Sequence, residues 1–177
     1  TTVIVQAGES KWESQADEEG TFTITVPLQK AGTEISVTAT DQAGNISEVT
    51  KVTVADVTAP EKPEVDQITD KSAAVAGKAE AGSTVTVRVG EAKWEGQADK
   101  DGKFSIEILV QKAGTEISIT ATDQAGNISE VTKVTVTDVT APAKPVVNQV
   151  TDKMDTVSGK AEVNSKVTVY KGKVELG

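Results

Sequence analysis

The sequence contains no cysteine and no histidine, and these two absences exclude several kinds of chemistry. Without cysteine there is neither a disulfide framework nor a thiol nucleophile. Without histidine the commonest general base and the commonest ligand of transition metals are missing. Serine, lysine and aspartate are plentiful, but no nucleophile has an obvious activating base. We therefore expect no enzymatic activity.

Aromatic residues are scarce, at 3% of the chain, and no apolar run is long enough to cross a bilayer, so we expect no membrane span in this segment. The core is left to Val, Ile, Thr and Ala, which suit a pleated, half-buried surface better than a helix. The net charge of −9 argues against binding nucleic acid, whose phosphates it would repel. The sequence has no initiating methionine and no signal peptide, which indicates a segment of a longer protein.

What the sequence does contain is a repeat with a period of 82 residues. Trp12 recurs as Trp94 and Phe22 as Phe104. When residues 1–55 are aligned with 83–137, 39 of the 55 positions are identical. A tandem array of such closely matched copies indicates a mechanical or architectural role.

The one complete repeat shows the short alternating runs and turn residues of β-strands. Val85, Val87 and Val89 alternate with polar residues, and no segment has a helical period. The strands that we expect span about 64–68, 73–79, 84–89, 93–98, 104–108, 117–121 and 129–136. Seven short antiparallel strands in about 80 residues predict an all-β, immunoglobulin-like β-sandwich.

The repeat divides the chain into three parts. Residues 56–137 form the complete repeat, 1–55 lack the first two strands, and 138–177 contain only the first strands. Residues 138–164 supply what the first part lacks. One hypothesis is that the tail of one molecule completes the head of the next by strand addition, which would propagate as a filament. The alternative is that the missing strands lie elsewhere in a longer chain.

Three segments resemble a known family: Asp56-Val-Thr-Ala-Pro60, the run from Val75 to Val87, and Thr120-Ala-Thr-Asp-Gln-Ala-Gly-Asn127. They are similar to the bacterial immunoglobulin-like repeats found in tandem in surface adhesins and cell-wall-anchored proteins. The resemblance implies a seven-stranded sandwich that acts as a spacer or stalk outside a bacterial cell. It also implies contact with neighbouring repeats of the same chain, and calcium at the junctions between domains in some relatives.

Acidic residues support a possible calcium site. In an antiparallel sandwich alternate turns lie at the same end, so three turns and the connector should bring carboxylates together where two repeats meet. Calcium takes six to eight oxygen ligands, commonly carboxylates. The candidate ligands are Asp56, Asp99, Asp101 and Asp123 at the first junction, with Asp138 and Asp41 as their counterparts. Ordinary hairpin turns explain the same residues without a metal, as does ionic contact with the Lys30 end of the preceding repeat.

Three functions therefore remain open. The first is a structural stalk, in which proline-containing connectors restrict bending between repeats. The second is an adhesion module that binds a host glycan or protein. Trp12 and Trp94 either form an exposed platform for a sugar in such a module or anchor the core. The third is an accessory region of a secreted hydrolase whose catalytic part lies outside this chain. The near identity of 29–54 and 111–136 favours the stalk, since a recognition site is usually singular.

Overall fold

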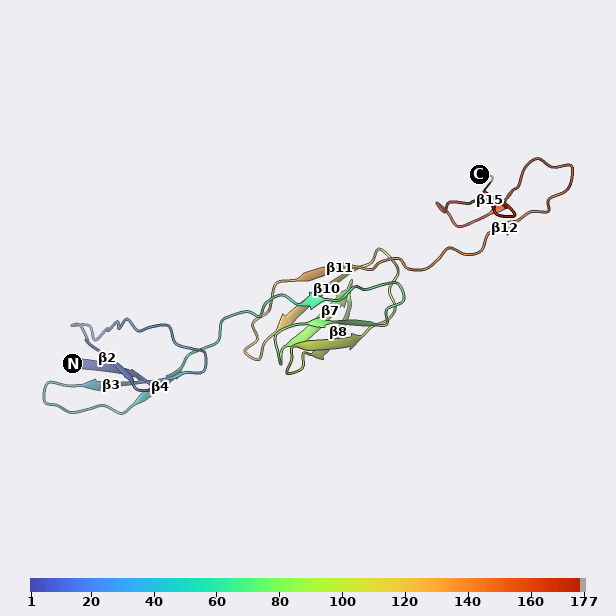
Figure 1. Ribbon diagram of the computed structural model, residues 1–177. Helices are drawn as coiled ribbons and strands as arrows, with labels where there is room; N and C mark the ends of the chain where they lie inside the picture. The colour runs from blue at the N-terminus through green and yellow to red at the C-terminus, as the bar shows by residue number, and fades with distance from the viewer. Residues whose placement is uncertain (176–177) are drawn as a thin grey trace.

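The computed structural model describes residues 1–175, and these contain fifteen strands and no helix. The strands fall into three groups along the chain, joined by extended connectors (Figure 1). We call residues 1–55 the first segment, 56–137 the middle segment and 138–175 the last segment. No helix in the described part is long and apolar enough to cross a membrane. The all-β class predicted from the alternating runs is confirmed.

The middle segment contains two antiparallel sheets. One sheet has the order β5-β6-β9 and the other the order β11-β10-β7-β8. The bounds are β5 Glu64–Val65, β6 Ala74–Lys78, β7 Thr84–Val89, β8 Ala92–Gln97, β9 Lys103–Glu107, β10 Glu116–Thr122 and β11 Thr132–Thr135. Three of the expected strands are shorter than predicted, and β6 lacks one residue at each end of the expected 73–79. β5 ends at Val65, and β11 begins only at Thr132, because the residues before it form the loop after β10.

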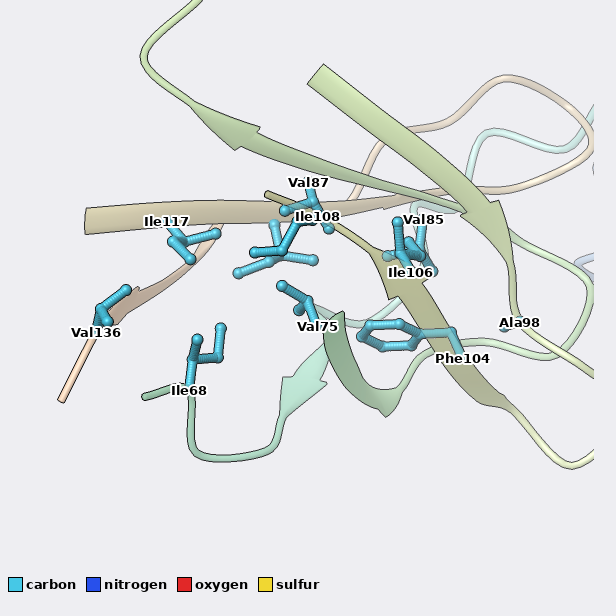
Figure 2. Packing of buried hydrophobic residues seen from close by; sticks show 11 residues of the cluster. Ile68, Val75, Val85, Val87, Ala98, Phe104, Ile106, Ile108, Ile117 and Val136 are labelled. Atoms are coloured by element: carbon cyan, nitrogen blue, oxygen red, sulfur yellow. The ribbon is translucent and has the colours of Figure 1, made fainter. Parts of the chain in front are cut away.

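The interior of the middle segment lies between these two sheets (Figure 2). Val85 and Val87 of β7 and Ile117 and Ile119 of β10 are fully buried. Val75 of β6, together with Phe104 and Ile106 of β9, covers them from the other sheet. The period-two alternation thus places one apolar face of each sheet against the other.

The first segment repeats only one of these sheets. Its strands are β1 Thr2–Ala7, β2 Ser10–Gln15, β3 Glu34–Thr40 and β4 Thr50–Thr53, in the order β2-β1-β3-β4. This order and its register match β8-β7-β10-β11, since Val5 lies opposite Trp12 as Val87 lies opposite Trp94. Residues 21–25, which align with β9, form no strand. In the middle segment β9 pairs with β6, and the first segment contains no counterpart of β6.

The last segment contains four two-residue strands. They are β12 Val146–Val147, β13 Gly159–Lys160, β14 Tyr170–Lys171 and β15 Val174–Glu175. β12 pairs with β13 in the register of β5 with β6. The strand expected at 166–171, the counterpart of β7, is reduced to Tyr170–Lys171. The reason is a missing partner, because β7 is held by β10 and this segment has no equivalent of β10.

Two glycines show why the β5–β6 and β12–β13 pairs are alike. A Cβ atom on Gly77 would lie 2.1 Å from the carbonyl oxygen of Glu64, and one on Gly159 would lie 2.2 Å from that of Val146. Real Cβ atoms do not approach backbone oxygen so closely. The two strands of each pair can therefore come this near only because the position is glycine.

Candidate functional site: the two ends of the middle segment

Two of the candidate aspartates, Asp99 and Asp123, hold tight turns with their own carboxylates. Oδ1 of Asp99 accepts hydrogen bonds from the backbone amides of Asp101 and Lys103, at 2.8 and 2.9 Å. Oδ1 and Oδ2 of Asp123 accept from the backbone and side-chain amides of Asn127, both at 2.8 Å. These are the self-capping turns that Asp favours.

The first segment builds the same turns with the same residues. Asp41 accepts from the backbone and side chain of Asn45, again at 2.8 Å each. Hydrogen bonding from the Asn45 side chain lowers the pKa of Asp41, and that from Asn127 lowers the pKa of Asp123. Hydrogen bonds to a carboxylate favour its charged form, which is why both pKa values shift downward.

The structure brings some of the predicted calcium ligands together and separates others. Asp56, Glu80 and Asp123 line one groove, which Ala31 and Gly32 of the first segment also line. Asp99 lines a different groove, beside β5, β6 and β9. The Oδ1 atoms of Asp56 and Asp138 each accept the amide two residues ahead, from Thr58 and Thr140.

Among the described residues, no group of three or more acidic side chains is arranged to hold a metal ion. Carboxylates instead accept hydrogen bonds from nearby backbone amides at Asp41, Asp56, Asp99, Asp123 and Asp138. The side chain of Asp101 lies 3.8 Å from the ammonium nitrogen of Lys100. Calcium binding at the junctions stays a prediction. The order of the strands predicted that Asp99 would lie with Asp56 and Asp123, but Asp99 lines a different groove.

The connector that enters the middle segment is fixed to it. Pro60 and Pro63 are buried, and the Thr132 hydroxyl donates to the Pro63 carbonyl oxygen at 2.5 Å. The side-chain amide of Asn127 donates to the carbonyl oxygen of Asp56 at 3.2 Å. We call these two contacts, of Asn127 with Asp56 and of Thr132 with Pro63, the entry clamp.

The connector that leaves the middle segment is fixed at the opposite end. Thr137 pairs with the chain after β5, donating its amide to Ile68 and accepting from the amide of Asp70, at 2.9 and 3.0 Å. Oδ1 of Asp70 accepts the amide of Val139 at 3.0 Å, and Nζ of Lys71 donates to the Val139 carbonyl oxygen at 3.3 Å. We call this set of contacts the exit clamp.

Asp70 contributes both its carboxylate and its backbone amide to the exit clamp, and the sequence pattern indicated no such role for it. Hydrogen bonds from the Thr140 side chain and the Val139 amide lower its pKa, so it is charged at neutral pH. The sequence held one signal, because Thr69-Asp70-Lys71 recurs as Thr151-Asp152-Lys153 after the same connector. That signal marks a repeated turn, but it does not reveal which backbone amides the turn will meet.

Trp94 was expected either to anchor the core or to form an exposed platform. It is partly buried and packs against the core from β8, opposite Val87. Trp12 has the same place in the first segment, opposite Val5, and is also partly buried. The placement of Trp94 is that of a core anchor at the margin of a sheet.

Together these features define a class of protein: tandem immunoglobulin-like β-sandwich modules whose connectors are held by the modules themselves. A family model described as "Bacterial Ig domain" matches residues 1–56 and 59–138. The chain belongs to this bacterial immunoglobulin-like family, as its connector and loop motifs predicted.

Two curated relatives come from Bacillus subtilis (strain 168). Bacillopeptidase F is 32% identical over 158 residues, covering 84% of this chain and 10% of the relative. Cell wall-associated protease is 31% identical over 139 residues, covering 77% of this chain and 15% of the relative. The chain thus spans only a small part of each. A solved structure of the BSP domain of a biofilm-associated protein is 24% identical, with a TM-score of 0.43, and covers 80% of this chain and 25% of that one.

Proposed function

We propose that this chain is part of an extended stalk outside a bacterial cell, which holds another part of the same protein away from the surface. The observation that carries the proposal is that both connectors of the middle segment are bonded to it, by the entry clamp and by the exit clamp. A flexible string of domains would leave its connectors free.

The two clamps stiffen the chain by removing rotations that a free connector keeps. The prolines fix φ near −65° and disfavour the helical region for the residue before them. The entry clamp holds the backbone at Asp56 and at Pro63, on the two sides of Pro60, and the exit clamp holds residues 137–139, just before Pro142 and Pro145. The contacts therefore restrict bending where each connector meets the middle segment.

The chemistry of the chain fits a structural module better than a catalytic one. The interior of the middle segment is filled by apolar side chains, and the buried polar side chains Ser83, Thr86 and Ser129 each have a hydrogen-bond partner. Repeated copies of one surface lengthen an array, whereas a recognition site needs to occur only once.

A second candidate function is favoured by the two curated relatives. Both are named as proteases, and this chain matches only 10% and 15% of their lengths. One is named for its association with the cell wall. An accessory stalk of a cell-wall protease, with the catalytic domain elsewhere in the protein, agrees with both names and with the clamped connectors.

Small-angle X-ray scattering of the full chain tests the stalk. We expect a well-defined largest dimension for the natural sequence and a broader distribution of distances for the double variant Asn127→Ala, Asp70→Ala, which removes one side-chain contact from each clamp. Asp101→Ala is the matched control, because that carboxylate contacts neither connector.

If the double variant and the natural sequence give the same scattering, the clamps do not set the stiffness. The same samples measured with calcium and with a chelator test the junctional calcium hypothesis. A change between the two conditions that Asp123→Ala abolishes would support calcium, and identical curves would remove it.

A further inference from the structure

The strand β8 forms an open edge of the four-stranded sheet in the middle segment. Among residues 1–175, β8 pairs with β7 and with no other strand, so it lies at the outside of the order β11-β10-β7-β8 (Figure 1). The opposite edge differs, because the Thr132 hydroxyl of β11 donates to the Pro63 carbonyl oxygen of the entry connector. An edge strand presents a row of backbone N–H and C=O groups to which another strand can add.

The hydrogen bonding of β8 shows which of its backbone groups face outward. The Ala98 amide donates at 3.0 Å to the carbonyl oxygen of Ser83, in the chain that leads into β7. The backbone groups of an antiparallel strand alternate in direction from one residue to the next. The N–H and C=O groups of Lys93, Glu95 and Gln97 therefore point away from β7, toward the open edge.

The side chains of β8 carry opposite charges two positions apart on one face. Nζ of Lys93 lies 2.5 Å from Oε1 of Glu95, and the two side chains are 42% and 48% exposed. Trp94 lies between them on the other face, partly buried against the core. Charges on an edge usually keep a second strand away. The order lysine, tryptophan, glutamate instead makes this edge complementary to an antiparallel copy of itself.

We propose that β8 pairs edge to edge with β8 of a second copy of this chain, antiparallel and with the two Trp94 residues opposite each other. In this register Lys93 of each copy lies opposite Glu95 of the other, and their outward backbone groups form hydrogen-bonded pairs. The two Trp94 residues form the intervening pair, in which opposite side chains are closest. The second copy thus receives hydrogen bonds, opposite charges and an aromatic contact from one short strand.

Charge selects this register over its neighbours. A slide of one strand by two residues in either direction keeps the backbone groups matched. One slide places Lys93 opposite Lys93 of the second copy, and the other places Glu95 opposite Glu95. Opposite charges directly across a strand pair stabilise it, and like charges destabilise it. The side chains therefore favour the register centred on Trp94.

The strand β2 of the first segment presents the same edge. Among the described residues it pairs with β1 alone, and its Lys11-Trp12-Glu13 repeats the order of charges. The Ala16 amide donates to the carbonyl oxygen of Thr1 at 2.9 Å, as Ala98 does to Ser83, so the outward groups of β2 are the equivalent ones. Each chain then carries two self-complementary edges, and association side by side is able to continue beyond two copies.

This contact goes beyond the stalk function and does not depend on it. The clamps lie at the two ends of the middle segment, whereas β8 lies along its side. The scattering of the clamp variants can fail to differ while copies associate, and association can fail while the clamps hold.

Analytical ultracentrifugation of the full chain tests the proposal. We expect the average mass to rise with concentration above the 18.4 kDa of one chain. An acidic-edge variant carries Lys11→Glu and Lys93→Glu, and a basic-edge variant carries Glu13→Lys and Glu95→Lys. Each variant alone places like charges opposite each other, so its association should weaken by more than about tenfold.

An equal mixture of the two variants is the decisive sample. In the register centred on tryptophan every glutamate of one variant meets a lysine of the other, so the mixture should associate like the natural chain. Both variants keep a negative net charge, so mixing them adds no general attraction. A natural chain that stays at the mass of one chain up to about 1 mM would overturn the proposal. So would a mixture that associates no better than either variant alone.

The matched control changes the same charges on the other edge strands. Lys51 of β4 and Lys133 of β11 are equivalent positions of the repeat, and each pairs with a glutamate of its neighbouring strand. Lys51→Glu with Lys133→Glu alters the net charge as the acidic-edge variant does, but leaves β2 and β8 intact. At physiological salt, which screens net charge, the control should associate like the natural chain. A loss equal to that of the acidic-edge variant would contradict an edge-specific contact.

Amide hydrogen exchange locates the contact on the strand. The amides of Lys93 and Glu95 point outward, so they should exchange quickly in a dilute sample and slowly in a concentrated one. The amides of Trp94 and Gly96 point toward β7 and should be protected in both samples. A rise in mass without any change at Lys93 and Glu95 would place the contact elsewhere and overturn the proposal.

Discussion

Replacing Phe104 with alanine should unfold the middle segment far more readily than the same change at Phe22 unfolds the first segment. The two residues hold the same place in the repeat, but Phe104 is 5% exposed and Phe22 is 43% exposed. Truncating a buried Phe to Ala costs about 3–5 kcal/mol. For Phe22, about half of the transfer free energy of a phenyl side chain is at stake, which is about 1–2 kcal/mol.

The difference is large enough to measure. A loss of about 3 kcal/mol in a domain of this size lowers Tm by at least about 12 °C, because each kcal/mol shifts Tm by about 4–8 °C. Urea unfolding followed by tryptophan fluorescence resolves the two segments. Trp94 reports on the middle segment in a Trp12→Phe background, and Trp12 reports on the first in a Trp94→Phe background.

The measurement belongs at the lowest concentration that gives a signal, so that contacts between molecules do not bury Phe22. Equal costs for the two substitutions would refute the reasoning, because they would mean that the second sheet contributes nothing to the burial of Phe104. A cost below about 1 kcal/mol at Phe104 would refute it as well.

Two further predictions concern the turns of the middle segment. Gly102→Ala should destabilise the middle segment strongly, because φ is +75° there and a Cβ would lie 2.5 Å from the carbonyl oxygen of Ala79. Gly90→Ala, where φ is +56° and the space around the Cβ is open, should cost only about 1–2 kcal/mol. Equal urea midpoints for the two variants would contradict this prediction. The folded state lowers the pKa of Asp123 below its ordinary value of 3.8 through the Asn127 side chain, so its contribution is complete above that value and is lost as the pH falls through the folded pKa. Tm should therefore drop in acid, and Asn127→Ala should flatten that drop in a calorimetric pH series.

Much of the architecture followed from local sequence patterns. β7 was predicted to span Thr84–Val89 and does so, because its alternation of Val with polar residues fits a strand buried on one face. The turns at Asp99 and Asp123 were also predictable, since Asp caps the amides that follow it. These features depend on residues only a few positions apart, so the sequence alone predicts them.

The candidate site was harder to predict. The sequence identified acidic residues at the turns and left self-capping turns and a metal site both open, but it did not reveal that Asp99 and Asp123 line different grooves. It also missed Asp70, whose partner Val139 lies 69 residues further along the chain. Contacts over such separations depend on where the fold brings the two segments together, and no spacing rule in the sequence encodes them.

Residues 21–25 and 103–107 are aligned copies of one segment, and their difference shows what the sequence determines and what the tertiary structure determines. Sequence alone determined the repeat, the all-β class and the apolar alternation that both segments share. Only the tertiary structure decided that 103–107 is the strand β9 and that 21–25 is not, because β6 pairs with the first and no strand among residues 1–175 pairs with the second. A strand needs hydrogen-bond partners from another part of the chain, so alternation gives a segment the capacity to be a strand and the neighbouring strand makes it one.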